Sequence, residues 1–275
     1  MAERGTAVVA WEVCSVSAPV FLAADDLTGV RSGDAYVLGG DEGRHAGVVQ
    51  RRAPGETVDV VDGAGTRLRG VVTSVEGTDV HLRVEARTDE PAPDVVLTLV
   101  QALAKGDRDH LAVEAAVEVG VDAVVPWQAD RSVVVWRGSR AAKSRGRWES
   151  TVRSAVKQAR RAWLPAVGEH LTSRQLAART RDVVDAGGAV VVLHEEATTA
   201  LAEVVLPVPA ETGPDAVAPE LFVVVGPEGG IGSDELSALR SAGAVAARLG
   251  PHVLRTSTAG PVAVALLSER LGRWR

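Results

Sequence analysis

Apolar runs of four to six residues alternate with helix-like segments from about residue 95 onward. Residues 95–100 read VVLTLV, and residues 190–193 and 221–225 are similarly apolar. Strands that lack alternation of polar and apolar side chains are typical of parallel sheets covered on both faces. Strands that alternate with helices along a chain build layered α/β domains. This part of the chain is therefore predicted to be an α/β domain with a parallel sheet.

The other elements of this part are predicted from apolar spacing and from the residues that end helices. Leu111, Ala115 and Val119 are four residues apart, which predicts a helix over residues 109–119 that Gly120 closes. Pro126 is expected to stop a strand at residues 121–125, and Pro261 to lie in the first turn of the last helix. The remaining helices are predicted at residues 148–163, 173–181, 233–242 and 261–273, with a strand at residues 244–249.

The first 88 residues have a different pattern, with short β-branched runs separated by turn signals such as Pro54-Gly55 and Asp62-Gly63. The predicted strands are residues 36–38, 46–49, 57–61, 68–72 and 80–84. Closely spaced short strands indicate a small antiparallel barrel. Residues 88–94, with two prolines and three acidic side chains, suit a linker. We therefore expect two domains, at residues 1–88 and 89–275.

Composition excludes several classes of protein. A chain of 275 residues with 46% hydrophobic and 24% charged residues is long and apolar enough for a substantial core. Its single cysteine excludes an internal disulfide and a cysteine-cluster zinc site. No uncharged apolar run approaches the roughly 18 residues of a membrane span. Glu3 and Glu12 make the N-terminus a poor signal peptide, so a cytoplasmic location is expected.

One segment carries concentrated positive charge. Residues 137–161 hold nine Arg and Lys side chains and one acidic residue, Glu149, within a chain whose net charge is −6. Such a basic stripe is typical of a surface that binds a polyanion. A solvated helix face is the alternative interpretation.

Two glycine-containing loops each follow a predicted strand and lead into a predicted helix. Residues 226–232 read GPEGGIG, and residues 248–261 read RLGPHVLRTSTAGP. Glycines let the backbone approach a ligand closely, and ligands of open α/β sheets bind at the carboxyl ends of strands. The first loop is neither a Walker A loop, because no Gly-Lys-Ser/Thr follows, nor a GxGxxG fingerprint. By itself it is equally compatible with a tight structural turn.

Together these loops resemble the C-terminal signature of the SPOUT-class 16S ribosomal RNA uridine-N3 methyltransferases, the RsmE type. The matching residues are Gly226-Pro-Glu-Gly-Gly230 and Leu249-Gly-Pro-x-x-Leu-Arg-Thr-x-Thr-Ala259. Upstream stretches also resemble family motifs: residues 45–51 (HAGVVQR), 105–108 (KGDR), 118–122 (EVGVD), 147–148 (RW) and 158–161 (QARR). The resemblance covers most of residues 36–260.

The resemblance implies a small PUA-like β-barrel domain followed by a SPOUT-type α/β methyltransferase domain with a C-terminal trefoil knot. It also implies S-adenosylmethionine as cofactor, a homodimer without a metal, and 16S rRNA or the assembled small ribosomal subunit as partner. The methyl acceptor would be N3 of one uridine in the decoding region. The implied cofactor-binding residues are Leu193, His194, Glu195, Val225, Gly226, Pro227, Glu228, Gly229, Gly230, Leu249, Gly250, Val253, Leu254, Arg255, Thr256, Thr258 and Ala259.

Three positions depart from the family pattern. Ser257 stands where the family usually has Glu, His252 where Arg is common, and Ala115 begins a stretch (residues 115–120, AAVEVG) that lacks the lysine of the family's K-A-T-E-L-G helix. A catalytic carboxylate at position 257 is therefore not carried over to this chain.

Methylation of uridine N3 requires loss of the imide proton, so a catalyst positions the reactants and stabilises negative charge on the base. Arg255 is the candidate that orients the uracil or a neighbouring phosphate, and a structural pair with Glu228 is its alternative. Glu228 is expected to order the loop, contact the cofactor or act as general base.

Nine residues are the candidates for RNA contacts. His45 is among them, although a structural hydrogen bond is its commoner role. The candidates are His45, Arg51, Lys105, Arg108, Arg147, Arg153, Lys157, Arg160 and Arg161. Two rival functions are a SPOUT enzyme that methylates another position such as a ribose 2′-O, and a non-catalytic rRNA-binding assembly protein.

Overall fold

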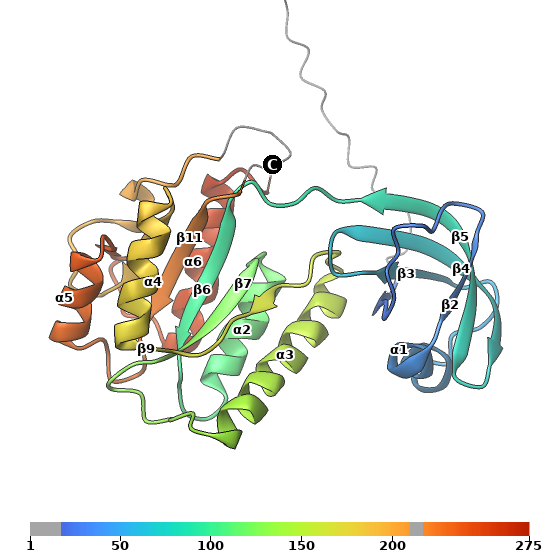
Figure 1. Cartoon of the computed structure of the whole chain (residues 1–275), viewed down its shortest axis with the longest axis horizontal. Coiled ribbons are helices and arrows are strands. Elements are labelled where there is room, and N and C mark those ends of the chain that lie inside the picture. The colour runs from blue at the N-terminus through green and yellow to red at the C-terminus, as the bar shows by residue number, and fades with distance from the viewer. Residues whose placement is uncertain (1–17, 210–216, 275) are drawn as a thin grey trace, which may run out of the picture.

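The N-terminal part of the computed structural model is a curled sheet, and the C-terminal part is a layered α/β unit (Figure 1). The structure describes residues 18–209 and 217–274. An extended connection between Asp89 and Val96 joins the two parts. The expectation of an α/β fold with a parallel sheet is confirmed.

The N-terminal sheet has five strands in the order β1-β3-β4-β5-β2. They are β1 (Val20–Leu22), β2 (Ala35–Leu38), β3 (Thr57–Val61), β4 (Thr66–Glu76) and β5 (Asp79–Asp89). Alternate side chains of β4 and β5 point into a core around Phe21, which is fully buried. The neighbours β1 and β3 are parallel, so the sheet is mixed rather than wholly antiparallel as expected.

The prediction of a strand at residues 46–49 is wrong. This segment is helical: α1 (Gly40–Arg44) continues into a π-helical turn (His45–Val49). Glycines allow the segment to pack closely on the sheet, because a Cβ at Gly43 would lie 2.3 Å from the Leu38 carbonyl oxygen. A Cβ at Gly47 would lie 3.0 Å from the side chain of Val75. Tertiary packing therefore overrides the β-branched local sequence.

The C-terminal sheet has the order β12-β10-β11-β6-β7-β8, with β9 also paired to β7, and all of its pairs are parallel. Its strands are β6 (Val96–Ala102), β7 (Ala123–Gln128), β8 (Ala166–Val167), β9 (Leu171–Thr172), β10 (Ala189–Leu193), β11 (Glu220–Val225) and β12 (Val245–Ala247). The helices are α2 (Arg108–Glu118), α3 (Ser139–Ala159), α4 (Ser173–Asp185), α5 (Ser233–Ser241) and α6 (Thr256–Arg270), with a 3-10 turn at Leu201–Glu203.

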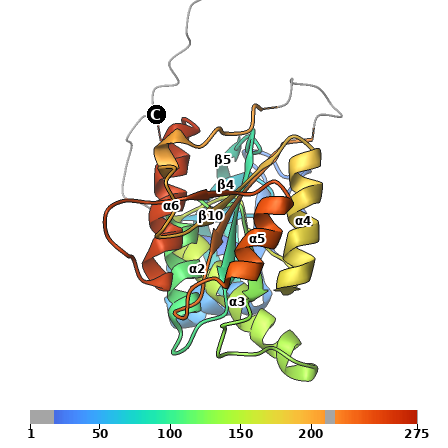
Figure 2. The same ribbon diagram turned by 90° about the vertical axis from the view of Figure 1, so that its left-hand side faces the viewer.

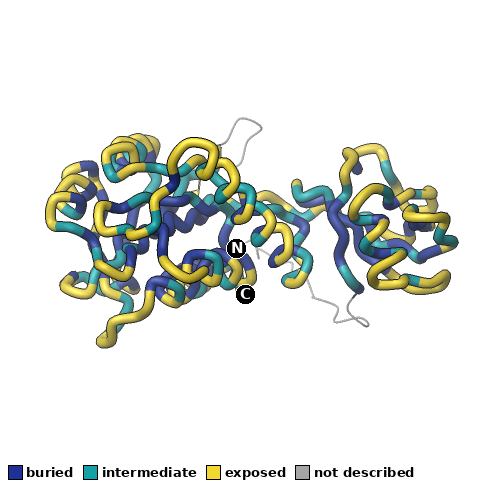
Figure 3. The backbone as a smooth tube through the Cα atoms, turned by 90° about the horizontal axis from the view of Figure 1, so that it is seen from below, coloured by how far each residue is buried: buried dark blue, intermediate teal, exposed yellow. Residues whose placement is uncertain are grey.

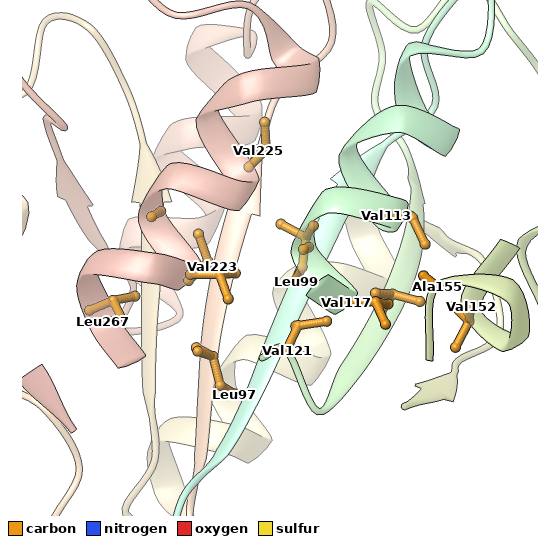
Figure 4. Packing of buried hydrophobic residues seen from close by; sticks show 14 of the residues in the cluster. Leu97, Leu99, Val113, Val117, Val121, Val152, Ala155, Val223, Val225 and Leu267 are labelled. Atoms are coloured by element: carbon orange, nitrogen blue, oxygen red, sulfur yellow. The ribbon is translucent and has the colours of Figure 1, made fainter. Parts of the chain in front are cut away.

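Helices cover both faces of this sheet. Helices α2 and α6 lie on one side, and α4 and α5 lie on the other (Figure 2). On the first side, Leu97 and Leu99 of β6 pack with Val113 of α2, Val152 of α3 and Leu267 of α6 (Figure 4). A separate apolar cluster joins α4 and α5 to the other face of the sheet. Burial on both faces explains why these strands are continuously apolar.

Several element boundaries differ from the sequence-based predictions. Helix α3 ends at Ala159 rather than at residue 163, because Arg160 adopts a left-handed conformation with φ of 56°. Helix α6 begins at Thr256, so Pro261 lies inside the helix and not in its first turn. Strand β7 continues through Pro126, which falls between the stretches that pair with β8 and β9.

Helix α2 occupies its predicted place but buries a different face. Its buried side chains include Ala112, Val113, Ala116 and Val117, whereas Leu111 is 55% exposed. The spacing of Leu111, Ala115 and Val119 therefore identified the helix without identifying its core face.

Each part has its own core, with buried segments inside and exposed segments outside (Figure 3).

An ion pair, a hydrogen bond and a close packing contact join the two parts of the molecule. Lys157 Nζ of α3 lies 2.8 Å from Glu42 Oε1 of α1, and Leu164 N donates to Gly63 O at 2.9 Å. Gly65, with φ of +101°, leaves space for Trp163, because a Cβ there would lie 2.7 Å from the indole ring. These contacts hold the N-terminal sheet against the end of α3.

Candidate functional site

Three loops meet at the carboxyl edge of the parallel sheet. They follow β10, β11 and β12, and β10 lies between the other two in the sheet. The loops enclose a cavity of about 900 Å³. Strand order thus gathers segments around residues 194, 228 and 252 at a topological position where α/β sheets bind ligands.

Most of the predicted cofactor residues line this cavity. They are Leu193, His194, Glu195, Val225, Gly226, Pro227, Glu228, Gly229, Gly230, Leu249, Gly250, Val253, Leu254, Arg255, Thr256 and Ala259. Thr258 is not among the lining residues, and it is exposed on α6.

The loop after β11 depends on its glycines in specific ways. A Cβ at Gly226 would lie 2.7 Å from the Ile231 side chain, so no larger residue fits without a shift. Gly230 has φ of +73°, a conformation that L side chains rarely adopt, and its N–H closes a turn onto Pro227 O at 2.9 Å. In contrast, a Cβ at Gly250 would meet nothing within 4 Å. The first loop is thus sterically constrained at two glycines.

A buried polar chain connects this loop to α6 and β6. Gln101 Nε2 donates to Thr256 Oγ1 at 2.9 Å, and Thr256 Oγ1 donates to Gly226 O at 2.8 Å. Both side chains are buried. Buried hydrogen bonds of this kind specify one arrangement, because breaking one leaves an unsatisfied polar group. The sequence did not single out Gln101, which looks like an ordinary strand residue.

Glu228 is paired with a cation that the sequence assigned to RNA. Arg108 Nη1 lies 2.8 Å from Glu228 Oε1, and the backbone N–H of Lys105 donates to the same oxygen at 3.1 Å. Burial raises the pKa of Glu228. Hydrogen bonds from its own and the Lys105 backbone, together with Arg108, outweigh burial and hold that pKa below its ordinary value. The carboxylate is therefore ionised near neutral pH and fastens the loop to the end of β6.

Arg255 does not pair with Glu228 in the structure. It is the N-cap of α6, it lines the cavity and it is exposed. Its carbonyl accepts the N–H groups of Thr258 and Ala259, and no ion pair of its guanidinium is found within the described residues. The side chain is thus available to a ligand in the cavity.

The nine candidate RNA residues separate into two groups. Six are exposed: Arg51, Lys105, Arg108, Arg147, Arg153 and Arg160. The other three are partly buried and bonded inside the protein. The amide nitrogen of Gln50 lies 3.0 Å from His45 Nε2, and Lys157 pairs with Glu42.

Arg161 is the third member of the bonded group. Its Nη1 donates to Val121 O at 2.7 Å and to Val117 O at 2.9 Å, and its Nη2 lies 3.8 Å from Asp122. Burial lowers the pKa of the guanidinium, and the Asp122 carboxylate opposes that shift. The guanidinium of Arg161 thus donates to carbonyls at the end of α2. Arg161 does not lie on the surface with the exposed cations.

Arg161→Ala is expected to destabilise the protein, because it leaves the carbonyls of Val117 and Val121 without their charged donor, while Asp122 keeps its pair with Arg273. The free energy of unfolding should fall by about 2–3 kcal/mol, the range for lost hydrogen bonds to charged groups. Urea denaturation followed by circular dichroism measures the change. Arg153→Ala, on the exposed side of α3, is the control and should change the free energy by less than about 0.5 kcal/mol. Equal midpoints for the two variants would contradict this role.

The sequence missed several residues of the cavity wall. Arg131, Glu196, Ile231, Arg248 and His252 also line it. Arg131 comes from the loop after β7, and its Nη1 donates to Gly229 O at 3.0 Å. No local pattern marks this arginine, because its place beside the glycine loop depends on the sheet order.

Within the described residues, no group of three or more His, Cys, Asp and Glu side chains is placed to hold a metal ion. In the same part of the chain, no helix has the length and apolarity to cross a membrane.

Comparisons with known proteins show which family this chain resembles. The family model of the RNA methyltransferase domain matches residues 90–268. Ribosomal RNA small subunit methyltransferase E of Mycobacterium bovis is 46% identical over 243 residues, which cover 88% of this chain and 89% of that protein. The protein of the same name from Bacillus subtilis is 28% identical over 245 residues, covering 87% and 91%.

Among solved structures, ribosomal RNA small subunit methyltransferase E of Neisseria gonorrhoeae, bound to S-adenosyl methionine, is similar with a TM-score of 0.77. It is 26% identical, and the match covers 92% of this chain and 98% of that one.

Proposed function

The chain belongs to the ribosomal RNA small subunit methyltransferase E family, and we propose that it methylates N3 of one decoding-region uridine in 16S rRNA. The methyl donor is S-adenosylmethionine. The observation that carries the proposal is the cavity of about 900 Å³, where loops from three adjacent strands meet. The same proposal includes a trefoil knot in the C-terminal domain and a PUA-like N-terminal domain, with a boundary after residue 88.

The residues of the cavity fit this cofactor. Its volume lies within the roughly 300–1,000 Å³ of small-molecule sites. Gly226, Gly229 and Gly250 present backbone amides and carbonyls that a ligand can approach closely, and Leu193 and Leu249 offer apolar contacts. When bound, the cofactor supplies an electrophilic methyl group on a sulfonium sulfur. The protein then needs mainly to orient the two reactants.

Arg255 is the residue proposed to stabilise the substrate. As the N3 proton leaves, negative charge spreads onto the uracil oxygens, and a fixed cation lowers the energy of that state. Arg255 lies exposed on the cavity wall at the start of α6, which suits this task. Glu228 is a weaker candidate for proton acceptor, because its lowered pKa gives the carboxylate little affinity for a proton. We assign it to fixing the loop.

Exposed cations would bind the RNA backbone. Arg147 and Arg153 lie on α3, and Lys105 lies beside the cavity, whereas Arg108, although exposed, already pairs with Glu228. Phosphate contacts of this kind add affinity that falls with salt and carry little sequence information. The paired side chains of Lys157 and Arg161 are assigned to the fold instead.

A homodimer is part of the proposal. Thr258, Val262 and Leu266 lie four residues apart along the exposed side of α6, and Leu111 is exposed on the neighbouring α2. Exposed apolar side chains spaced along one helix face are suited to burial against a second copy.

Methyl transfer to ribosomal subunits tests the function. The protein should transfer label from S-adenosylmethionine to 30S subunits that lack N3-methyluridine. Primer extension should then stop at one decoding-region uridine, because an N3 methyl group blocks the Watson–Crick edge. Naked 16S rRNA in a parallel reaction distinguishes the free RNA from the assembled subunit as substrate.

Other outcomes would contradict the proposal. Transfer without a primer-extension stop would indicate a position such as a ribose 2′-O. Cofactor binding without any transfer to either substrate would indicate another RNA. Binding to rRNA with neither transfer nor cofactor binding would indicate a non-catalytic assembly protein.

A further inference from the structure

Arg131 lies where the loop between β7 and α3 reaches the cavity. Its Nη1 donates to Gly229 O at 3.0 Å, and its Cβ is the atom nearest to a Cβ built on Gly229, at 3.1 Å. The side chain is exposed and lines the cavity. Within the described part of the chain, its Nε and Nη2 have no hydrogen-bond partner. One donor thus holds the guanidinium in place, and the others are free to bind a ligand.

A buried carboxylate fixes this loop to the glycine loop. Glu235 of α5 is only 4% exposed. Its Oε1 accepts the N–H of Asp130 at 2.8 Å, and its Oε2 accepts the N–H of Gly232 at 3.0 Å. Ser173, at the start of α4, donates to the same carboxylate. Arg131 is therefore held on a backbone with a defined position relative to Gly229, as a recognition residue requires.

Exposed cations follow Arg131 along the chain as far as the first half of α3. Arg137, Arg140, Lys143 and Arg147 are all exposed. No ion pair of these four side chains is found in the described ranges, in contrast with Lys157 and Arg161 farther along. A run of unpaired exposed cations attracts the backbone of a nucleic acid. Arg131 is the member of this run that lies at the cavity.

We infer that Arg131 positions the RNA substrate by donating its free N–H groups to anionic oxygens of the target nucleotide. The planar guanidinium matches the paired oxygens of a phosphate. The phosphodiester beside the target base is one source of such oxygens, and the uracil oxygens that gain charge during the reaction are the other. This inference rests on the proposed function and adds a residue that neither the motifs nor the comparisons assign.

Three variants test the inference: Arg131→Ala, Arg131→Lys and the control Arg181→Ala. Arg181 is exposed on α4, away from the cavity lining and from α3. Four quantities are measured: the Kd for S-adenosylmethionine, the Kd for 30S subunits as a function of salt, and the KM and kcat for methyl transfer. Arg131→Ala should leave the cofactor Kd within about twofold and reduce kcat/KM about tenfold or more, the effect of a lost charged contact.

The two kinds of anionic oxygen predict different results for Arg131→Ala. A phosphate contact predicts weaker 30S binding with the slope of log Kd against log salt reduced by about one, and kcat unchanged. A contact with the uracil oxygens predicts a lower kcat at saturating RNA and an unchanged salt slope. In either case Arg131→Lys should recover part of the loss, because it keeps the charge without the forked geometry.

Two results would overturn the inference. One is wild-type behaviour of Arg131→Ala in all four quantities. The other is a cofactor Kd that rises in proportion to the loss of kcat/KM, which would assign Arg131 to the cofactor. If the wild-type protein transfers no methyl group, the proposed function fails. The salt-dependent 30S binding of the variants then still decides whether Arg131 contacts RNA.

Discussion

Gly229→Val is expected to weaken binding of S-adenosylmethionine by about 10–100-fold, or about 1.4–2.8 kcal/mol, which lies within the roughly 1–3 kcal/mol typical of overpacking. The new Cβ would lie 3.1 Å from the Cβ of Arg131 and 3.4 Å from its carbonyl oxygen. The two methyl groups of valine would add further crowding there. The loop must then move away from Arg131, and the cavity wall moves with it. Isothermal titration calorimetry measures the affinity.

Gly29→Ala is the matched control for this prediction. It changes a glycine of the N-terminal part, outside the cavity lining, where a Cβ would meet nothing within 4 Å. Its affinity for the cofactor should stay within about twofold of wild type, since no neighbour has to shift. Thermal melting shows whether each variant is folded. Full affinity in a folded Gly229→Val protein would show that this loop does not shape the cofactor site.

Arg255→Ala is expected to reduce kcat for methyl transfer by about 10²–10³-fold, the typical cost of losing one donor that stabilises transition-state charge. The structure leaves this guanidinium exposed on the cavity wall, while Glu228 takes Arg108 as its partner. The removed cation is therefore one that the fold itself does not use. Single-turnover transfer to 30S subunits, with both reactants saturating, measures the effect on the chemical step.

Two further variants make this result specific. Arg255→Lys should recover part of the rate because it restores a cation without the planar donor geometry. Arg240→Ala removes an exposed arginine of α5 outside the cavity lining and should retain the wild-type rate. If Arg255→Ala raised only the Kd of the cofactor and left kcat intact, Arg255 would serve cofactor binding rather than the substrate.

Strand identity was the most predictable part of the fold. Residues 57–61 and 221–225 are β-branched or apolar runs bounded by turn residues, and both are strands. Residues 46–49 have a similar composition but form a helical turn, because Gly43 and Gly47 let the segment pack closely on the sheet. The composition of four residues indicates only their local preference for a strand, and close packing between distant segments outweighed that preference here.

The candidate site was predictable to the extent that it lies in continuous loops. Gly226 to Gly230 and Leu249 to Arg255 were found as motifs, and the structure places both on one cavity. The roles of the charged residues were harder to predict from the sequence. Nothing in the sequence distinguishes Arg108 from Arg161, yet Arg108 pairs with Glu228 and Arg161 donates to carbonyls at the end of α2. Their partners are set by tertiary contacts.

The sequence by itself determined the α/β class with a parallel sheet and the glycine loops that follow its strands, because the spacing of apolar residues and the position of glycines act over a few neighbouring residues. Only the tertiary structure decided that β10 lies between β11 and β12, and that their loops therefore share a cavity. It also brought Arg131 to Gly229, 98 residues away along the chain. Such contacts depend on strand order and helix packing. These are set by interactions throughout the core, not by any local stretch of sequence.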